Sequence, residues 1–256
     1  MKTNTLTAVI LTKNEENNIV RAVQSVQFCN KIIVLDDNST DKTVELAKRE
    51  GAQIVTHSLD NNFAQQRNYA LRLVETDWVL FIDADEEVSE ELRDELQTSK
   101  LEEYSSYSIP RRDFFWHTEL RHGETAKARN RGIVRLVKKD TGSWDGTVHE
   151  VFISDERHGR LTGYINHYSH AGIAEFLQDI NAYSTLRATE LFARNVQTSV
   201  ISIIAYPVAK FFLTYVVYRG FLDGPAGFTY SFMMSFHSFL VRAKLYQYIR
   251  FGKLSV

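Results

Sequence analysis

The chain has 256 residues, of which 30 are Lys or Arg and 32 are Asp or Glu, so its formal net charge is −2. This length suits one substantial α/β domain with an appendage, and the charge gives no whole-chain argument for binding nucleic acid. Cys29 is the single cysteine, which excludes an intramolecular disulfide or a cysteine-based zinc cluster and fits a reducing compartment.

The first hundred residues alternate between strand and helix patterns. Strands are expected at 6–11, 31–35, 53–56 and 78–82, and helices at 14–26, 41–50 and 63–74, the first of these capped by Asn14. No long apolar segment precedes the first strand, so a secretory signal is not expected. The rhythm predicts an α/β fold with a parallel sheet and right-handed crossovers.

An apolar run, WVLFIDADE at 78–86, ends abruptly in carboxylates at Asp83, Asp85 and Glu86. Such a run indicates a buried strand of a mostly parallel sheet, and ligands bind beyond the carboxyl ends of these strands. Two acids separated by one small residue can hold a hard divalent cation that bridges phosphate oxygens. Glu86 is expected to start the next helix instead.

A second acidic loop, DDNSTD at 36–41, follows the strand KIIVL. In a parallel sheet it lies at the same edge as the first acidic cluster. A carboxylate there can accept from an imide N–H or from ribose hydroxyls, which suits a nucleotide. Alternatively, Asp37 or Ser39 is only a turn residue, and Asp41 is only a helix cap.

The middle of the chain has strand patterns at 107–110 and 133–138, a turn with an extended run at 142–152, and a helical pattern at 172–196. The segment 111–135 is rich in Arg and His. It is expected to be a mobile basic loop near an anionic ligand, because Arg suits bidentate phosphate contacts. A solvated surface loop is the alternative.

The C-terminal part contains an apolar stretch of 19 residues at 200–218, close to the roughly 20 needed to span a bilayer. Pro207 and Lys210 near its middle weaken a spanning interpretation, since a central Lys costs roughly 3 kcal/mol on insertion. The residues that follow are aromatic and basic, which is typical of elements at a membrane interface. Buried or dimerising helices and a true span are the alternatives.

Four segments resemble, in order and spacing, family 2 glycosyltransferases with the GT-A fold: TAVILTKNEENNI, IIVLDDNSTDKT, FAQQRNYAL and DWVLFIDADEEVS. The lipopolysaccharide core β-glucosyltransferase-like group is more similar still. It shares RRDF at 111–114, HG at 122–123, RL at 135–136, VHE at 148–150 and GFLDG at 220–224. The resemblance implies a Rossmann-like, mostly parallel sheet flanked by helices at 1–170, and a helical membrane-proximal extension at 171–256.

The resemblance also implies roles for individual residues. Thr12, Asn14 and Glu15 would border a nucleoside pocket, Asp36 would recognise uracil or ribose, and Arg67 would lie against the nucleoside or diphosphate. Asp83 and Asp85 would hold Mg²⁺ or Mn²⁺ and, through it, the sugar diphosphate. The metal offsets the charge that builds on the leaving group.

Inverting transfer also needs a carboxylate that deprotonates the acceptor hydroxyl. Glu150 is the candidate base by resemblance, and pairing with an arginine is its alternative role. His149 either orients that site or is a structural donor. The segment ETAKARNRGIV at 124–134 departs from the W-Y-P-D-like run of close relatives and is expected to face the acceptor or the donor sugar.

The resemblance therefore implies a metal-dependent, inverting sugar transferase that uses a nucleotide-diphospho-sugar, UDP-linked. Its acceptor would be a glycolipid or a cell-envelope saccharide such as lipopolysaccharide core. The protein would be cytoplasmic and peripheral at the inner membrane face, with a homodimer as a further expectation. One alternative is a nucleotidyltransferase, although TKNEEN stands where such enzymes carry a Gly-rich loop. Another is a membrane-associated scaffold, against which intact Asp36, Asp83, Asp85 and Glu150 argue.

Overall fold

The computed structural model describes residues 5–60, 62–98, 101–146, 150–170 and 172–252. The chain forms two compact units. Unit 1 contains Met1–Arg112 and Ala128–His167, and unit 2 contains Asp113–Lys127 and Tyr168–Val256. The division after residue 170 expected from the sequence stays a prediction. The structure adds the short segment Asp113–Lys127 to the C-terminal unit.

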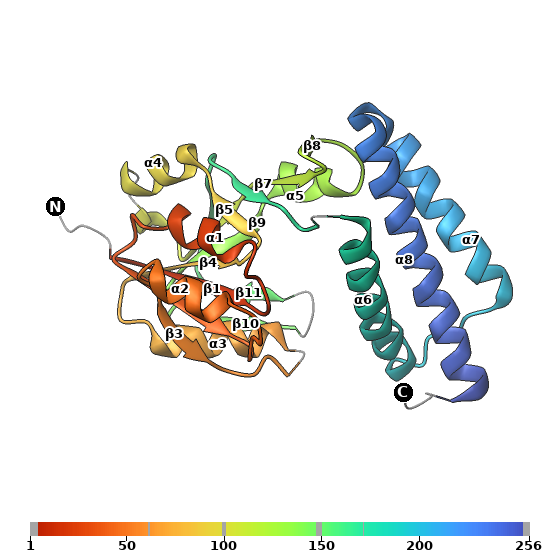
Figure 1. Cartoon of the computed structure of the whole chain (residues 1–256), viewed down its shortest axis with the longest axis horizontal. Coiled ribbons are helices and arrows are strands. Elements are labelled where there is room, and N and C mark those ends of the chain that lie inside the picture. The colour runs from red at the N-terminus through yellow and green to blue at the C-terminus, as the bar shows by residue number, and fades with distance from the viewer. Residues whose placement is uncertain (1–4, 61, 99–100, 147–149, 171, 253–256) are drawn as a thin grey trace. The chain divides into compact units, whose positions relative to one another are not determined.

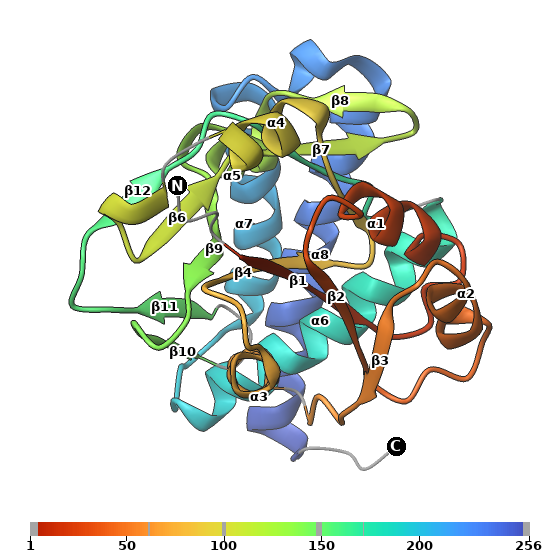
Figure 2. The same ribbon diagram turned by 90° about the vertical axis from the view of Figure 1, so that its left-hand side faces the viewer.

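Unit 1 is built on a seven-stranded sheet of order β12-β6-β9-β4-β1-β2-β3. Its strands are β1 (Leu6–Thr12), β2 (Lys31–Asp36), β3 (Gln53–Thr56), β4 (Trp78–Asp83), β6 (Ser106–Ile109), β9 (Ile133–Lys138) and β12 (His158–Arg160). Strand β1 pairs parallel with β2 and β4, and β2 pairs parallel with β3 (Figure 2). Only β9 runs antiparallel to its neighbours in this sheet. The predicted mostly parallel sheet is confirmed.

The core of unit 1 lies on both faces of the sheet because the central strand is apolar throughout. Every residue of β1, LTAVILT, is buried. One face carries α1 (Ile19–Ser25), α2 (Thr43–Arg49) and α4 (Glu90–Thr98), whose buried side chains join Ala8 and Ile10. The other face carries α3 (Phe63–Leu73), whose buried side chains join Val9 and Leu11. Trp144 in the hairpin of β10 (Ser143–Asp145) and β11 (Val151–Ile153) completes that second cluster.

The first helix is shorter than expected, because the loop after β1 has its own structure. Asn14 has a left-handed backbone with φ of 54°, which cannot begin an α-helix. The chain then makes a turn in which Asn18 N donates to Glu15 O over 3.0 Å, and α1 begins at Ile19 with Asn18 as its N-cap residue. The prediction that Asn14 caps this helix was wrong.

The basic segment 111–135 is not the mobile loop expected from its composition. It contains β7 (Arg111–Phe115), β8 (Thr118–Leu120) and α5 (Ala126–Arg131). Strands β7 and β8 pair antiparallel, and the turn between them places Trp116 and His117 at positive φ. Such turns favour Asn or Gly, so the sequence carries no hairpin signal here. Asp113 and Phe115 are buried, which a solvated loop would not allow.

Glu86 was also misplaced by the sequence pattern. It is fully buried and begins β5 (Glu86–Val88), whereas the next helix, α4, begins at Glu90. Strand β5 pairs antiparallel with β13 (Ile165–His167), and Glu86 lies opposite His167. A strand from much later in the chain therefore fixes the position of Glu86.

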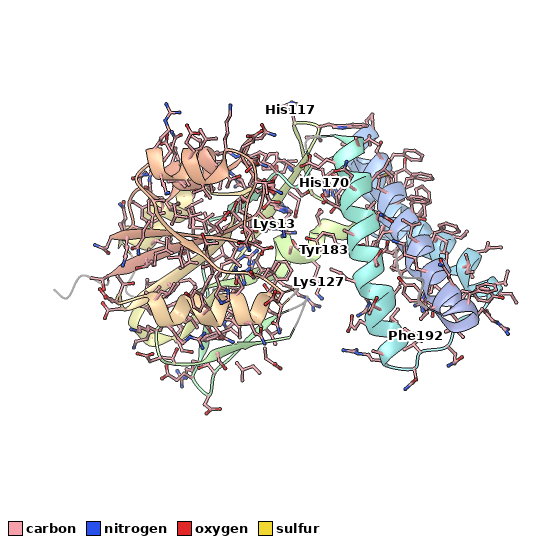
Figure 3. All side chains as sticks on the ribbon, turned by 60° about the horizontal axis from the view of Figure 1, so that its bottom comes forward. Lys13, His117, Lys127, His170, Tyr183 and Phe192 are labelled. Carbon is pink, nitrogen blue, oxygen red and sulfur yellow. The ribbon has the colours of Figure 1, made fainter. Side chains whose placement is uncertain are left out.

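Unit 2 consists mainly of α6 (Ile173–Ala193), α7 (Val200–Phe211) and α8 (Gly224–Phe251). Helix α8 lies between α6 and α7 and packs on both (Figure 1). Helix α7 begins at a Ser199 cap that accepts from Ser202 N, and it continues into a π-helical segment, Phe212–Val217. Among the described residues, one stretch, Val200–Val217, is long and apolar enough to cross a membrane. Helix α6 exposes the aromatic side chains of Tyr183 and Phe192 (Figure 3).

Two motifs that lie far apart in the sequence meet inside unit 2. His122 donates its backbone N–H to Asp223 Oδ2 over 2.9 Å, and its Nδ1 lies 2.7 Å from Asp223 Oδ1. Gly123 N donates to Tyr218 O over 2.9 Å. These hydrogen bonds therefore join the HG motif, which follows β8, to the GFLDG motif and to the end of the α7 segment.

Candidate active site

The two acidic loops lie at one edge of the sheet of unit 1. In the parallel register, Thr12 at the end of β1 is paired with Asp36 at the end of β2. On the other side of β1, Leu11 is paired with Asp83 at the end of β4. The expected common edge is confirmed, and it is the edge where parallel α/β sheets bind ligands.

Thr12 and Asp36 form a polar spot with unused hydrogen-bonding capacity. Both are buried, with exposed fractions of 7% and 2%. Asp36 Oδ2 accepts from Ser39 N over 3.0 Å. Asp36 Oδ1 and Thr12 Oγ1 have no hydrogen-bond partner among the described residues. Buried polar atoms are almost always paired, so two orphans on neighbouring strands indicate a polar ligand.

The loop that carries Asn14 and Glu15 is braced against the loop after β2. Asn14 N donates to Ser39 Oγ over 2.8 Å, and Asn14 Oδ1 accepts from Thr40 N over 2.8 Å. Glu15 N donates to Thr43 Oγ1 over 2.7 Å. These contacts hold the rim beside Thr12 and Asp36 in a fixed shape.

Asp83 is held by two arginines from different elements. Arg67 of α3 approaches its Oδ1 to 3.2 Å, and Arg135 of β9 approaches its Oδ2 to 2.6 Å. Burial raises the pKa of the Asp83 carboxyl, but the charges of Arg135 and Arg67 outweigh burial and lower that pKa from 3.8 to about 2. Asp83 is therefore ionised throughout the physiological range.

Glu86 is the second acid of this charged cluster that contacts Arg135. Its Oε1 accepts from Arg135 over 2.9 Å, and its Oε2 accepts from Asp83 N over 3.0 Å. The acids Asp83 and Glu86 raise the pKa of the Arg135 guanidinium further, despite its burial. Arg135 thus fixes the ends of β4 and β5 relative to each other.

Arg67 connects Asp83 to Glu150. Its Nε lies 2.9 Å from Glu150 Oε1, while its Nη2 contacts Asp83. Its Cζ lies 5.2 Å from the ring centroids of both Phe81 and Trp144, which hold the guanidinium in a cation–π contact. Arg67 Nη1 is buried with no partner among the described residues, so it is available to an anionic ligand.

The two metal-ligand candidates, Asp83 and Asp85, differ in the contacts that their carboxylate oxygens already make. Both oxygens of Asp83 face arginines, whereas Asp85 Oδ2 lies 3.1 Å from His167 Nε2. Burial raises the pKa of Asp85, but the charge and hydrogen bond of His167 outweigh burial, and the pKa falls below its usual range.

Asp85 and His167 offer a carboxylate oxygen and an imidazole nitrogen, a donor set that fits Mn²⁺ better than Mg²⁺, which prefers oxygen ligands, if phosphate oxygens and water complete the shell. Within the described part of the chain, no three His, Cys, Asp or Glu side chains form a group that could hold a metal ion. A bound metal would therefore depend on the ligand's own phosphates.

The structure brings together Arg67, Asp83 and Glu150, and separately Thr12 with Asp36. It places Asn14 and Glu15 in the bracing loop, and His149 lies outside the described residues. Sequence reasoning gave no role to Arg135, although the RL motif contains it, and it missed His167. His167 lies about 80 residues beyond Asp85, and no local pattern marks it.

A mostly parallel sheet with acidic loops at the carboxyl ends of β2 and β4 defines a fold of the GT-A type. The model of glycosyl transferase family 2 matches residues 7–153. An uncharacterized glycosyltransferase of Rickettsia bellii is 31% identical over 258 residues, covering 95% of this chain and 86% of that protein. The chain belongs to glycosyl transferase family 2.

Two further proteins are similar over different lengths. The lipopolysaccharide core biosynthesis glycosyltransferase LpsC of Rhizobium meliloti is 26% identical, over 94% of this chain and 92% of its own. Glucosyl-3-phosphoglycerate synthase of Mycobacterium tuberculosis, solved with Mn²⁺, UDP and phosphoglyceric acid, has a TM-score of 0.36 and 25% identity. That match covers 43% of this chain and 44% of the solved chain, less than half of its length.

Proposed function

We propose that this protein is an inverting glycosyltransferase that moves a sugar from a UDP-sugar to a glycolipid or cell-envelope saccharide. The observation that carries the proposal is the pair of unpartnered buried oxygens, Asp36 Oδ1 and Thr12 Oγ1, at the sheet edge. A nucleoside offers an N–H and hydroxyls to such atoms. The cluster of Arg67, Asp83 and Arg135 on the other side of β1 supports a diphosphate next to it.

The donor end of the site needs positive charge, because a nucleoside diphosphate leaves with its negative charge increased. Arg67 Nη1 is buried and unpartnered, and its guanidinium is held in place by Phe81 and Trp144. Such a preorganised donor stabilises charge without reorganising during the reaction. Asp85 and His167, with Asp83 beside them, would hold Mg²⁺ or Mn²⁺, which supplies further Lewis-acid stabilisation of the leaving group.

Glu150 is the proposed base. It takes the proton of the acceptor hydroxyl while the new bond to the anomeric carbon forms and the bond from that carbon to the diphosphate breaks. Its Oε1 is held by Arg67 Nε at 2.9 Å, which fixes the carboxylate and leaves Oε2 to face the acceptor. The competing role is a purely structural partner of Arg67.

Similarity over most of the chain supports the proposed acceptor class. The alignment with LpsC, which acts in lipopolysaccharide core biosynthesis, covers 94% of this chain and therefore includes both units. We extend the proposal to an acceptor of that kind and to a cytoplasmic protein bound peripherally at the inner membrane face. A homodimer stays a separate expectation.

A thermal-shift panel of UDP-, GDP-, ADP- and dTDP-sugars, each with and without Mn²⁺, tests the donor and the metal together. A UDP-sugar at about 100 times its Kd should stabilise the protein by about 2.7 kcal/mol. Asp36→Asn should lose the nucleotide shift, and Asp85→Asn should lose only its Mn²⁺-dependent part. The control is Asp94→Asn, because Asp94 is an exposed acid on α4 outside the site.

The proposal fails if no nucleotide-sugar shifts the unfolding temperature, or if Asp85→Asn responds to Mn²⁺ like the native chain. Glu150→Gln separates the two roles of Glu150, because the amide oxygen still accepts from Arg67. A base role predicts a fall in the transfer rate of about 10²–10⁴-fold with unchanged nucleotide binding. A structural role predicts unchanged transfer.

A further inference from the structure

Helix α7 carries an apolar stripe that no part of the described chain covers. The stripe, called the α7 face, consists of Ile201, Ile204, Ala205, Val208 and Phe212. Its members stand at positions i, i+3, i+4, i+7 and i+11, so they lie along one side of the helix. The large side chains are exposed by 78%, 64%, 64% and 59% for Ile201, Ile204, Val208 and Phe212. Together with Ala209 they line a shallow groove without a polar residue.

The opposite side of the same helix is fixed within unit 2. Helix α7 packs along α8, where Ser235 Oγ donates to Pro207 O over 2.7 Å. Lys210 Nζ lies 2.6 Å from Glu124 Oε2, and Thr214 in the following π-helical turn is fully buried. Because these contacts prevent rotation of α7 about its own axis, the α7 face stays exposed.

The C-terminal segment that carries this face is mostly basic, although Lys210 of α7 is paired with Glu124. Residues 200–256 contain six basic residues and one acid, a formal charge of +5, whereas the rest of the chain carries −7. The acid, Asp223, has a side chain that is 4% exposed and bound to His122. Arg219 and Arg250 are exposed. An apolar stripe on a positively charged element is complementary to an anionic lipid surface.

A second copy of the chain fits this surface less well than a bilayer does. Two copies joined through the α7 face would bring two segments of charge +5 together. A bilayer containing anionic lipids accepts the apolar stripe and attracts the basic residues, which lie on the helix adjacent to α7 and at its end. One helix diameter, about 10 Å, is slightly more than the Debye length of about 8 Å at physiological salt, so the attraction is reduced for basic residues on the far side of α8 and is strongest for those closest to the bilayer.

The packing also favours a helix in the plane of the membrane over a crossing. If α7 crossed the bilayer, α8 would have to enter beside it, together with Arg242 and Lys244. Charged side chains in the hydrocarbon core are costly. Both ends of the α7 segment also remain attached to unit 2, at Ser199 and through the contact of Tyr218 with Gly123.

We propose that the α7 face docks unit 2 onto an anionic bilayer, with α7 lying in the interface plane and α8 above it. This docking mode presupposes the peripheral membrane location proposed above. It adds three details to that location. The α7 face is the surface that binds, α7 lies in the plane of the interface, and the lipids that it binds are anionic. It also places the unit next to a lipid-linked acceptor without any segment crossing the membrane.

The test is co-sedimentation with vesicles of phosphatidylcholine alone and of phosphatidylcholine mixed with phosphatidylglycerol. The native chain should bind the mixed vesicles more tightly, and high salt should weaken that preference. I204N/V208N should weaken binding to both vesicle types by more than about tenfold, because the stripe loses its two central apolar side chains. R219N/R250Q should weaken binding to the mixed vesicles only, by about tenfold.

A matched control is V151N/I153N in β11, where the same two residue types are exposed by 58% and 54% in unit 1. It should bind vesicles like the native chain. Circular dichroism and thermal unfolding show whether each variant is folded. Equal binding by I204N/V208N and the native chain overturns the proposal, and so does the absence of vesicle binding by the native chain. A dimer in solution that I204N/V208N dissociates, without vesicle binding, assigns the face to a second copy instead.

Failure here is distinguishable from failure of the transferase proposal. Nucleotide-sugar binding is measured in solution without vesicles and depends on Asp36 and Asp85 in unit 1. Loss of vesicle binding leaves that result unchanged, and loss of nucleotide binding leaves vesicle binding unchanged.

Discussion

Arg67 shows how one side chain can organise a charged site. Its side chain is 1% exposed, packs against two aromatic rings, and reaches acids that are 67 residues apart in the sequence, Asp83 and Glu150. An isolated buried cation would be very costly, and these two carboxylates offset that cost. These contacts fix the side chain, and under the proposed function its unpartnered Nη1 would be a preorganised donor to the diphosphate.

Asp37, which follows Asp36 in the sequence, allows a test of electrostatics at the residue scale. Its Oδ2 accepts from Lys13 Nζ over 2.8 Å, and its Oδ1 accepts from Leu59 N over 3.0 Å. Burial raises the pKa of Asp37, but these hydrogen bonds and the charge of Lys13 outweigh burial and lower the pKa below 3.8. The ionised form therefore stabilises the fold above pH 3.8, and that contribution is lost as the pH falls through the lowered pKa.

Asp37→Asn should lower the free energy of unfolding by about 1 kcal/mol at neutral pH, because a charged acceptor is lost. The difference from the native chain should shrink as the pH falls from 3.8 through the lowered pKa, because Asp37 of the native chain then becomes protonated as well. Urea unfolding at neutral and acidic pH measures this, with Asp94→Asn as an exposed control. An unchanged difference at acidic pH would contradict the assignment.

Sequence reasoning at the residue scale succeeded where a polar residue directly follows a strand. Asp36 and Asp83 could be placed at one edge because apolar runs precede both of them. Arg135, Glu86 and His167 could not be placed in the cluster, since β9, β5 and β13 join the site only through pairing with distant strands. The roles of these side chains depend on tertiary contacts, and the local spacing of residues in the sequence does not predict such contacts.

At the scale of elements, local patterns predicted the parallel half of the sheet well. The residues of β3 and β9 agree with the expected ranges, and β1, β2 and β4 each extend one residue further than expected. The failures lie where backbone geometry overrides composition. Asn14 adopts a left-handed conformation before α1, and Trp116 with His117 makes a tight turn without a recognisable turn sequence.

The close contact between the start of α8 and the 3₁₀ turn Gly220–Asp223 gives an element-scale prediction. A Cβ on Gly227 would lie 2.1 Å from Gly220 O and 2.8 Å from Asp223 Cβ. Gly227→Ala should therefore destabilise unit 2 by about 1–3 kcal/mol, although Ala favours a helix by about 1 kcal/mol. Chemical unfolding followed by near-ultraviolet circular dichroism measures the change.

Gly172→Ala is the matched control for that substitution. Gly172 is the N-cap residue of α6, and a Cβ there would meet no atom within 4 Å. Its variant should stay within about 0.5 kcal/mol of the native chain. If Gly227→Ala were equally neutral, the contact between the GFLDG turn and α8 would not be tight in solution.

At the scale of the whole molecule, each unit has its own core. Unit 1 holds two clusters on the two faces of its sheet, and unit 2 holds clusters around Phe115 with Phe176 and around Leu191 with Leu245. Separate cores predict two unfolding transitions in differential scanning calorimetry. A UDP-sugar with Mn²⁺ should raise the transition of unit 1 alone, since every proposed donor contact belongs to that unit.

Gly227→Ala shows which of the two transitions belongs to unit 2. It should lower the midpoint temperature of only that transition, which the ligand leaves unchanged. Equal shifts of both transitions on adding ligand would show that the units unfold together. A single transition that Gly227→Ala and the ligand both move would show the same.

The discontinuous make-up of unit 2 has a consequence for biosynthesis. The segment Asp113–Lys127 leaves the ribosome long before its partners, since His122 and Asp223 are separated by 101 residues. At 5–20 residues per second, the nascent chain waits for about 5–20 s before that contact can form. The last residue of unit 1, His167, is also synthesised after this segment, and unit 2 is completed last. The order of translation therefore has the sheet of unit 1 synthesised before the α7 face exists.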